Sequence, residues 1–172
     1  MILLKDLTQR KPAAHKLFHC LDEDIKMIKR MDHINLVVSN LERAKAFFLN
    51  LGFEEIDHAY LSGERFSLVT GLENSQAKYV ALALPGAETN LELIQYINPP
   101  GTGVSGSGQA NQIGLRHIAF AVDDIHTVVQ RLKTNGVRFQ SEIQTWKQSG
   151  KQIVYFYGPD GILLELAQYP DP

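Results

Sequence analysis

The sequence predicts an α+β fold made of two βαβββ modules, which form a cupped, mostly antiparallel sheet with helices on its outer face. Two internal similarities lead to this prediction. Residues 33–41, His-Ile-Asn-Leu-Val-Val-Ser-Asn-Leu, resemble residues 117–125, His-Ile-Ala-Phe-Ala-Val-Asp-Asp-Ile. Residues 91–96, Leu-Glu-Leu-Ile-Gln-Tyr, match residues 164–169 at five of six positions. Because the similarities stand at the beginning and at the end of each half, they indicate a duplicated module.

The first module is expected over residues 31–97 and opens with an apolar strand at 33–38. The segment Ser39-Asn-Leu-Glu42 has the form of a capping box, so a helix is expected to begin there and to stop near Gly52. Runs rich in β-branched and aromatic residues then predict the remaining strands of this module, near 53–61, 65–70, 77–84 and 89–97.

The second module is expected over residues 117–170. Asp123 and Asp124 are the candidates for the helix cap, and an apolar stripe follows them at helical spacing. The strands are expected at 117–122, 137–143, 151–157 and 162–168. Between the modules, residues 98–116 form a linker rich in Gly, Pro and Ser, which is long enough to serve as a flap over a site.

Residues 1–30 are expected to form an N-terminal helical extension. They hold seven Lys or Arg against four Asp or Glu, and apolar residues between Leu17 and Ile28 recur at helical spacing. Three interpretations stay open: contact with a membrane or partner, packing on the body or across a dimer, and a biological start at Met31. We assign this stretch no chemistry.

The composition excludes several classes of protein. The 172 residues include 17 Lys or Arg and 19 Asp or Glu, which gives a net charge of −2 and argues against nucleic-acid binding. The single cysteine, Cys20, has no partner for an internal disulfide and fits a reducing compartment. No apolar run reaches the ~18 residues of a transmembrane helix, and Lys5 and Asp6 interrupt the start before a signal peptide could form. A cytoplasmic location without a membrane partner is therefore expected.

Four polar residues stand inside the repeated apolar strands, namely His33, Glu92, His117 and Glu165. Each glutamate lies between two leucines that would face the helices, so its side chain is expected on the opposite, concave face. Taken singly, a strand histidine is more often a hydrogen-bonded core or rim residue, and such a glutamate usually faces solvent. Their occurrence in both halves favours a shared site, and two imidazoles with two carboxylates suit a divalent transition metal.

Residues 31–170 resemble the vicinal oxygen chelate superfamily, also called the glyoxalase/bleomycin resistance/extradiol dioxygenase fold. The resemblance is carried by Met31-Asp-His33-Ile, by Leu115-Arg-His117-Ile-Ala-Phe-Ala-Val-Asp-Asp-Ile125, and by Gly158-Pro-Asp-Gly-Ile-Leu-Leu-Glu165-Leu. It implies that His33, Glu92, His117 and Glu165 hold a divalent metal, with Ni, Co, Mn, Zn and Fe all open. The complete set is similar to those of glyoxalase I and methylmalonyl-CoA epimerase.

The resemblance implies a metal-dependent isomerase, epimerase or lyase that acts on a small substrate with vicinal oxygens through an enediolate or enolate. Glu165 is the first choice for the catalytic base and Glu92 the second. Two alternatives remain: a non-catalytic, drug-sequestering binding protein, and an Fe(II) extradiol-type dioxygenase.

The resemblance also bears on substrate and assembly. Bacterial glyoxalase I proteins contact glutathione through an arginine and an asparagine, and the corresponding positions here are Val37 and Tyr96. A glutathione adduct is therefore a doubtful substrate. The expected partners are a small-molecule substrate and a second copy in a homodimer. Whether the four ligands converge within one chain or across a dimer stays open.

Overall fold

The computed structural model describes residues 28–103, 110–111 and 113–170. The chain divides into a short unit, Met1–Met31, and a large one, Asp32–Pro172, and the fold given below is that of the large unit. The expected helix of the N-terminal extension and part of the expected linker lie outside the described residues.

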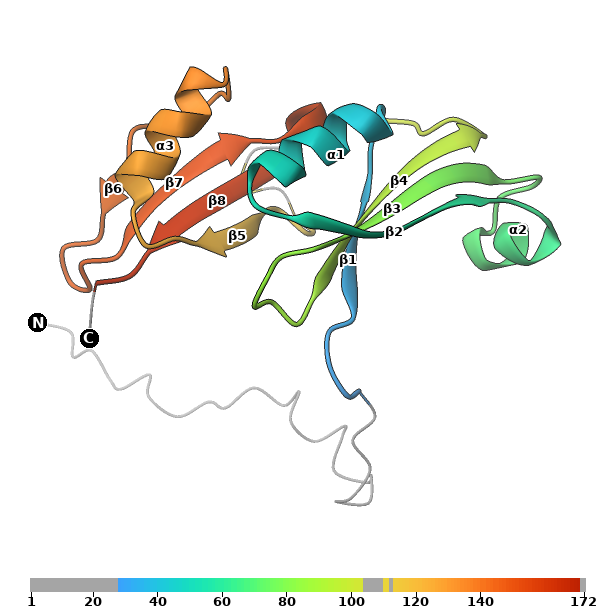
Figure 1. Ribbon diagram of the computed structural model, residues 1–172, viewed down its shortest axis with the longest axis horizontal. Coiled ribbons are helices and arrows are strands. Elements are labelled where there is room, and N and C mark those ends of the chain that lie inside the picture. Colours follow the sequence, from blue (N-terminus) through green and yellow to red (C-terminus); the bar gives the residue numbers. More distant parts are fainter. Residues whose placement is uncertain (1–27, 104–109, 112, 171–172) are drawn as a thin grey trace, which may run out of the picture. The chain divides into compact units, whose positions relative to one another are not determined.

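The first module contains two helices and one sheet (Figure 1). Its elements are β1 (His33–Val37), α1 (Leu41–Asn50), β2 (Glu54–Leu61), α2 (Glu64–Thr70), β3 (Gln76–Ala83) and β4 (Asn90–Asn98). The strand order is β1-β4-β3-β2. β1 runs parallel to β4, while the other neighbours are antiparallel.

The second module repeats this plan. Its elements are β5 (Ile118–Ala121), α3 (Ile125–Thr134), β6 (Gln144–Thr145), β7 (Gln152–Tyr157), the 3-10 turn η2 (Pro159–Gly161) and β8 (Leu163–Gln168). The strand order is β5-β8-β7-β6, with β5 parallel to β8. The structure thus confirms the predicted α+β fold of two βαβββ modules, and each module has its own four-stranded mixed sheet.

Both long helices begin at a residue whose side chain caps the backbone. Asn40 accepts a hydrogen bond from the Arg43 amide at 2.9 Å, and Asp124 accepts one from the Thr127 amide at 3.0 Å. The cap of α1 is therefore Asn40, one residue after the expected Ser39. Ser39 has another role: its amide and its hydroxyl both donate to Asp160 in the second module.

Two segments differ from the expected strands. Residues 64–70 form α2, because the left-handed conformation of Gly71, with φ of 69°, ends a helical turn, and the Thr70 hydroxyl donates to the Phe66 carbonyl at 2.9 Å. Residues 137–143 make only an isolated bridge between Phe139 and Phe156, and the edge strand is the two-residue β6. In both places, glycine-bounded turns and tertiary contacts outweighed the strand preference of the individual residues.

One hydrophobic core holds the two modules together. The buried residues come from both sheets and from the inner faces of α1 and α3, as in Leu93, Leu164, Phe48 and Ile125. Aromatic rings link Phe48 to Phe53 and Phe53 to Phe120 of the second module, with centroids 5.6 and 5.8 Å apart. No helix of the described segments is long and apolar enough to cross a membrane.

Candidate metal centre

The structure brings the four predicted site residues together in two pairs. His33 Nε2 lies 3.3 Å from Glu92 Oε2, and His117 Nε2 lies 3.3 Å from Glu165 Oε2. We call His33 with Glu92 the first half-site and His117 with Glu165 the second half-site. Within the described residues, no three His, Cys, Asp or Glu side chains gather closely enough to hold a metal ion. The four residues therefore form two half-sites in one chain.

The strand registers explain why the two half-sites have the same geometry. In the first module Asn35 pairs with Glu92, and in the second Ala119 pairs with Glu165. Each histidine stands two positions before the residue that pairs with the glutamate. Since side chains alternate along a strand, a histidine at that offset lies on the same face of the sheet as the glutamate.

The flanking leucines show which face this is. Leu91 and Leu93 are buried in the core, whereas the Glu92 side chain is 20% exposed and contacts His33. Leu164 and Leu166 are buried in the same way on either side of Glu165. The glutamates therefore point away from the core, as the spacing predicts.

A neighbouring carboxylate and a phenol orient the first half-site. His33 Nδ1 lies 3.1 Å from Asp32 Oδ2, and the Tyr79 hydroxyl donates to Glu92 Oε1 at 3.1 Å. Burial, together with Glu92, raises the pKa of Tyr79 to about 12, so the phenol remains a hydrogen-bond donor. When Nδ1–H is donated to Asp32, the lone pair of Nε2 faces the carboxylate.

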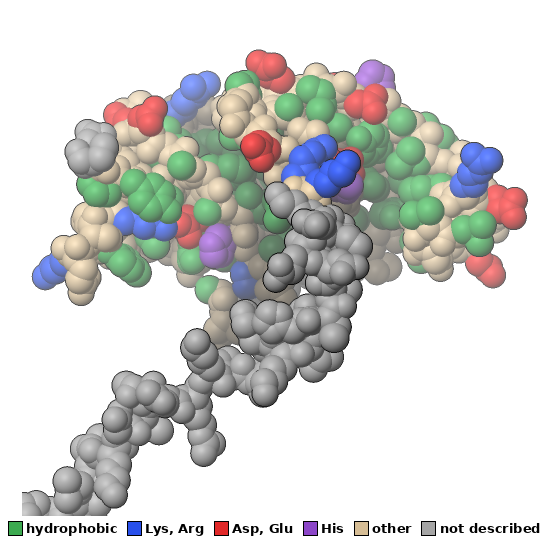
Figure 2. All heavy atoms as spheres, turned by 90° about the horizontal axis from the view of Figure 1, so that it is seen from below, with side chains coloured by type: hydrophobic (Ala, Val, Ile, Leu, Met, Phe, Trp, Pro, Cys, Tyr) green, Lys and Arg blue, Asp and Glu red, His purple; other side chains and the backbone are tan. Residues whose placement is uncertain are grey.

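A lysine and a different tyrosine surround the second half-site. Lys151 Nζ lies 3.5 Å from Glu165 Oε1, and the ring of Tyr155 lies 5.0 Å from that of His117. Burial, and secondarily the Glu165 charge, raises the pKa of Tyr155. Hydrogen bonding to Tyr169 is the largest cause of the raised pKa of Lys151, and Glu165 adds to it. Figure 2 shows histidine side chains at separate places on one face of the molecule, with acidic and basic side chains distributed among hydrophobic ones.

The donor atoms fit a metal ion by type and by spacing. Imidazole nitrogen and carboxylate oxygen bind ions such as Zn²⁺ at about 2.0–2.2 Å, so two neighbouring donors of one ion stand roughly 3.0–3.4 Å apart. The 3.3 Å separation in each half-site falls in this range. With Nδ1–H donated to Asp32, His33 Nε2 can face the Glu92 carboxylate only with a proton or a cation between them. One half-site supplies only two of the three or more protein ligands that a catalytic ion usually takes.

Sequence reasoning gave no role to Asp32 or Lys151. Asp32 directly precedes His33, and a carboxylate beside a metal-binding histidine is a recognisable signal. Lys151 lies next to β7, and only the pairing of β7 with β8 brings it to Glu165. The single sequence carries no local mark of that contact.

Comparison with known proteins gives consistent matches over the large unit. The model of the Glyoxalase/Bleomycin resistance protein/Dioxygenase superfamily matches residues 30–166. The uncharacterized protein YwkD of Bacillus subtilis (strain 168) is 30% identical over 141 residues, which are 81% of this chain and 97% of that protein. The mitochondrial methylmalonyl-CoA epimerase of Homo sapiens is 28% identical over 142 residues, 81% of this chain and 73% of that protein.

A solved structure has the same fold. The crystal structure of a glyoxalase family protein from Bacillus cereus covers 88% of this chain and 100% of its own, at 28% identity and a TM-score of 0.81. The family match, the doubled βαβββ module and the repeated histidine–glutamate pairs agree with one another. The chain belongs to the Glyoxalase/Bleomycin resistance protein/Dioxygenase superfamily.

Proposed function

We propose that this protein is a metal-dependent isomerase, epimerase or lyase of the glyoxalase type, which acts on a small substrate with vicinal oxygens. His33, Glu92, His117 and Glu165 would be the ligands of one divalent transition metal. The observation that carries the proposal is the doubled pair, with the same atoms at the same 3.3 Å in both modules. The kinship with a methylmalonyl-CoA epimerase supports an enzyme that moves a proton.

We further propose that two chains complete the centre as a homodimer. The described part of each chain supplies two donors at each of two places, and a two-fold axis can set the first half-site of one chain against the second half-site of the other. This arrangement gives two equivalent centres, each with two nitrogen and two oxygen donors. It also gives the duplicated module a reason to keep all four ligand types.

The chemistry follows from the four ligands and their neighbours. A divalent ion held by them would supply positive charge to two adjacent substrate oxygens as negative charge develops there. Glu165 is our first candidate for the base, because its side chain is only 7% exposed and would exchange protons with a bound substrate more readily than with bulk water. Glu92 is the second. Carboxylates from opposite half-sites provide for removing a proton on one face of a carbon and returning one on the other, as epimerisation requires.

Metal analysis of the purified protein tests the proposed site. The unaltered chain should bind about one ion per chain, and His33→Ala and His117→Ala should each lose it. His58→Ala is the matched control, since His58 contacts Glu55 outside both half-sites. Full metal content in both half-site variants would refute the proposed ligands.

Turnover tests the proposed activity. Metal-loaded protein should exchange or move a carbon-bound proton in a panel of 2-oxoaldehyde–thiol adducts and acyl-CoA epimers, and Glu165→Gln should abolish this while retaining the circular dichroism spectrum. Tight binding of an apolar compound by metal-free protein, without turnover, would favour the drug-sequestering alternative. Oxygen consumption with catechols and Fe(II) would favour the dioxygenase.

A further inference from the structure

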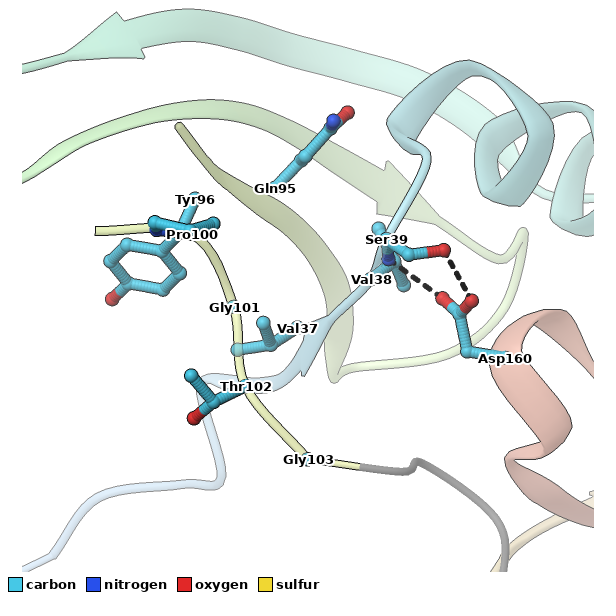
Figure 3. Close-up of a pocket in the computed structure, with 10 residues that line it drawn as sticks. All are labelled: Val37, Val38, Ser39, Gln95, Tyr96, Pro100, Gly101, Thr102, Gly103 and Asp160. Carbon is cyan, nitrogen blue, oxygen red and sulfur yellow. Dashed lines mark hydrogen bonds between the residues drawn. The ribbon is translucent and has the colours of Figure 1, made fainter. Parts of the chain in front are cut away.

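A cavity of about 590 Å³ opens beside the ends of β1 and β4 (Figure 3). Val37 and Tyr96 line it from these two strands, and Pro100 and Thr102 line it from the segment that follows β4. We call this cavity the Tyr96 pocket. A Cβ atom placed on Gly101 would lie 3.6 Å from Val37 Cγ1, so the backbone of this segment packs on Val37 and forms one wall.

Two residues that line the Tyr96 pocket lie on the sheet face that carries the first half-site. Val37 follows His33 by four positions on β1, and Tyr96 follows Glu92 by four positions on β4. Residues an even number of positions apart in a strand share a face, and four positions span about 13 Å. A ligand held at the first half-site could therefore extend along the two strands into the pocket.

Two polar side chains that line the pocket, Asp160 and Gln95, accept hydrogen bonds from other parts of the protein. Both carboxylate oxygens of Asp160 accept hydrogen bonds from Ser39, one from its amide and one from its hydroxyl (Figure 3). Gln95 Oε1 accepts the Leu41 amide at 2.9 Å. Among the described residues that line the pocket there is no Lys or Arg. A negatively charged group would thus meet no cation among these lining residues.

The remaining lining includes apolar side chains and an aromatic ring. Tyr96 stacks on Phe66, with ring centroids 6.1 Å apart and planes 16° from parallel. Val37 is 47% exposed despite its apolar side chain, and Pro100 lies close by. An uncharged flat ring would cover these surfaces and remove them from water.

We propose that the Tyr96 pocket receives an uncharged aromatic group of the substrate while the vicinal oxygens lie at the first half-site. This inference rests on the proposed function and makes it more specific: the substrate carries its aromatic group on a spacer of several bonds. Val37 and Tyr96 are the residues that determine this specificity.

Hydroxamates test the proposal, since each offers two adjacent oxygens to a metal. Calorimetry would compare acetohydroxamate, benzohydroxamate, 4-phenylbutyrohydroxamate and succinic monohydroxamate on Zn-loaded protein. The phenylbutyro compound, which is long enough to reach the pocket, should bind about tenfold more tightly than acetohydroxamate. Benzohydroxamate is too short, and the succinic compound ends in an anion, so neither should show this gain. A stronger gain for the anionic compound would overturn the proposal.

Two pairs of variants assign any gain to the pocket. Val37→Arg and Tyr96→Asn should bring the phenylbutyro compound to the affinity of acetohydroxamate measured on the same variant. Val37→Ile and Tyr96→Phe keep the apolar surface and should retain the gain. An affinity ratio that is the same in all four variants and the unaltered chain would place the phenyl group elsewhere and overturn the proposal.

A metal-free measurement separates this proposal from the proposed function. If acetohydroxamate fails to bind the Zn-loaded protein, the proposed binding of vicinal oxygens at the metal is refuted. The pocket is then tested with 4-phenylbutyramide, which does not chelate, on the metal-free chain. This compound should shift the NMR signals of the Val37 methyl groups and of Thr102, and Tyr96→Asn should remove the shifts. The absence of shifts in the unaltered chain would refute the proposed role of the Tyr96 pocket, independently of the metal site.

Discussion

The two half-sites share a backbone plan but differ in the charges around them. His33 is preceded by Asp32 and His117 by Arg116. Glu92 accepts a hydrogen bond from the neutral Tyr79 and is 20% exposed, whereas the Glu165 side chain is 7% exposed and contacts the cation of Lys151. The duplication has thus kept the imidazole–carboxylate pair and changed its neighbours.

Because of this difference the two carboxylates are not equivalent, although each lies 3.3 Å from a histidine Nε2. A nearly buried carboxylate is costly unless a cation or hydrogen bonds compensate its charge, and Lys151 supplies part of that compensation for Glu165. The first half-site has no comparable lysine contact among the described residues, and Glu92 instead accepts a hydrogen bond from Tyr79. A bound metal would therefore change the charge balance at the two half-sites to different extents.

The largest expected effect concerns how the half-sites combine. His33→Ala and His117→Ala chains should each bind no metal, but their co-expression should restore roughly a quarter of an ion per chain, because half of the dimers are mixed and each mixed dimer holds one complete centre. Tagged chains and metal analysis provide the measurement. His33→Ala co-expressed with Glu92→Ala is the matched control, since both changes damage the same half-site. Equal metal contents in the two mixtures would contradict a centre shared between chains.

A smaller effect should follow from removing the Asp32 carboxylate that contacts the first half-site. Asp32→Ala removes the acceptor that fixes His33 Nδ1, and metal affinity should fall about tenfold, at the lower end for such contacts because Asp32 is exposed. Competition with a chelating dye measures this. Asp32→Asn keeps an acceptor oxygen and should lose less. An unchanged affinity in Asp32→Ala would mean that this carboxylate does not orient the ligand.

At the second half-site, removing a neighbouring charged side chain should raise the metal affinity, which is the opposite of the effect expected at Asp32. Lys151 competes with a metal ion for the Glu165 carboxylate, so Lys151→Met should raise metal affinity, by up to about fivefold for such a partly exposed ion pair. Lys147→Met removes the same charge nearby and controls for net charge. A weaker metal affinity in Lys151→Met would show instead that this lysine supports the site.

The smallest expected effects are those of the two helix caps on the free energy of unfolding. Asn40→Ala should lower the free energy of unfolding by about 1 kcal/mol, equally at pH 7 and pH 3. Hydrogen bonds from the Thr127 side chain and backbone lower the pKa of Asp124, so its stabilising effect is present above the ordinary carboxyl pKa and is lost as the pH falls through the lowered value. The loss in Asp124→Ala should therefore shrink from pH 7 to pH 3. Urea unfolding at both pH values measures this, and an equal loss at both would refute the charged cap.

Several parts of the fold were predictable because their signals are local. The repeat identified both modules, and the apolar stripes of α1 and α3 are buried where the helical spacing placed them. The strand expected at 65–70 was wrong, since β-branched and aromatic residues favour a strand but Gly71 ends a helical turn there. The capping box was offset by one residue, because Ser39 bonds to Asp160, which is 121 positions away along the chain.

The sheet face that carries the four polar residues was predictable from the sequence. Alternation between two leucines places each glutamate on the outward face, and the duplication singles out His33 and His117 among six histidines. Their role as metal ligands stays a prediction. Lys151 and Asp160 could not be recognised in the same way, since each acquires its partner through contacts between distant segments.

By itself, the sequence determined the repeated module, because periodicity and turn chemistry act over a few residues. The duplicated strand plan also accounts for the equal geometry of the two half-sites, because the register of β1 on β4 is repeated in β5 on β8. The tertiary structure alone decided that the described residues hold two separate pairs in place of one cluster. The reason is that the modules are joined by long-range contacts, Phe53 on Phe120 and Ser39 with Asp160, which leave no pattern in neighbouring residues.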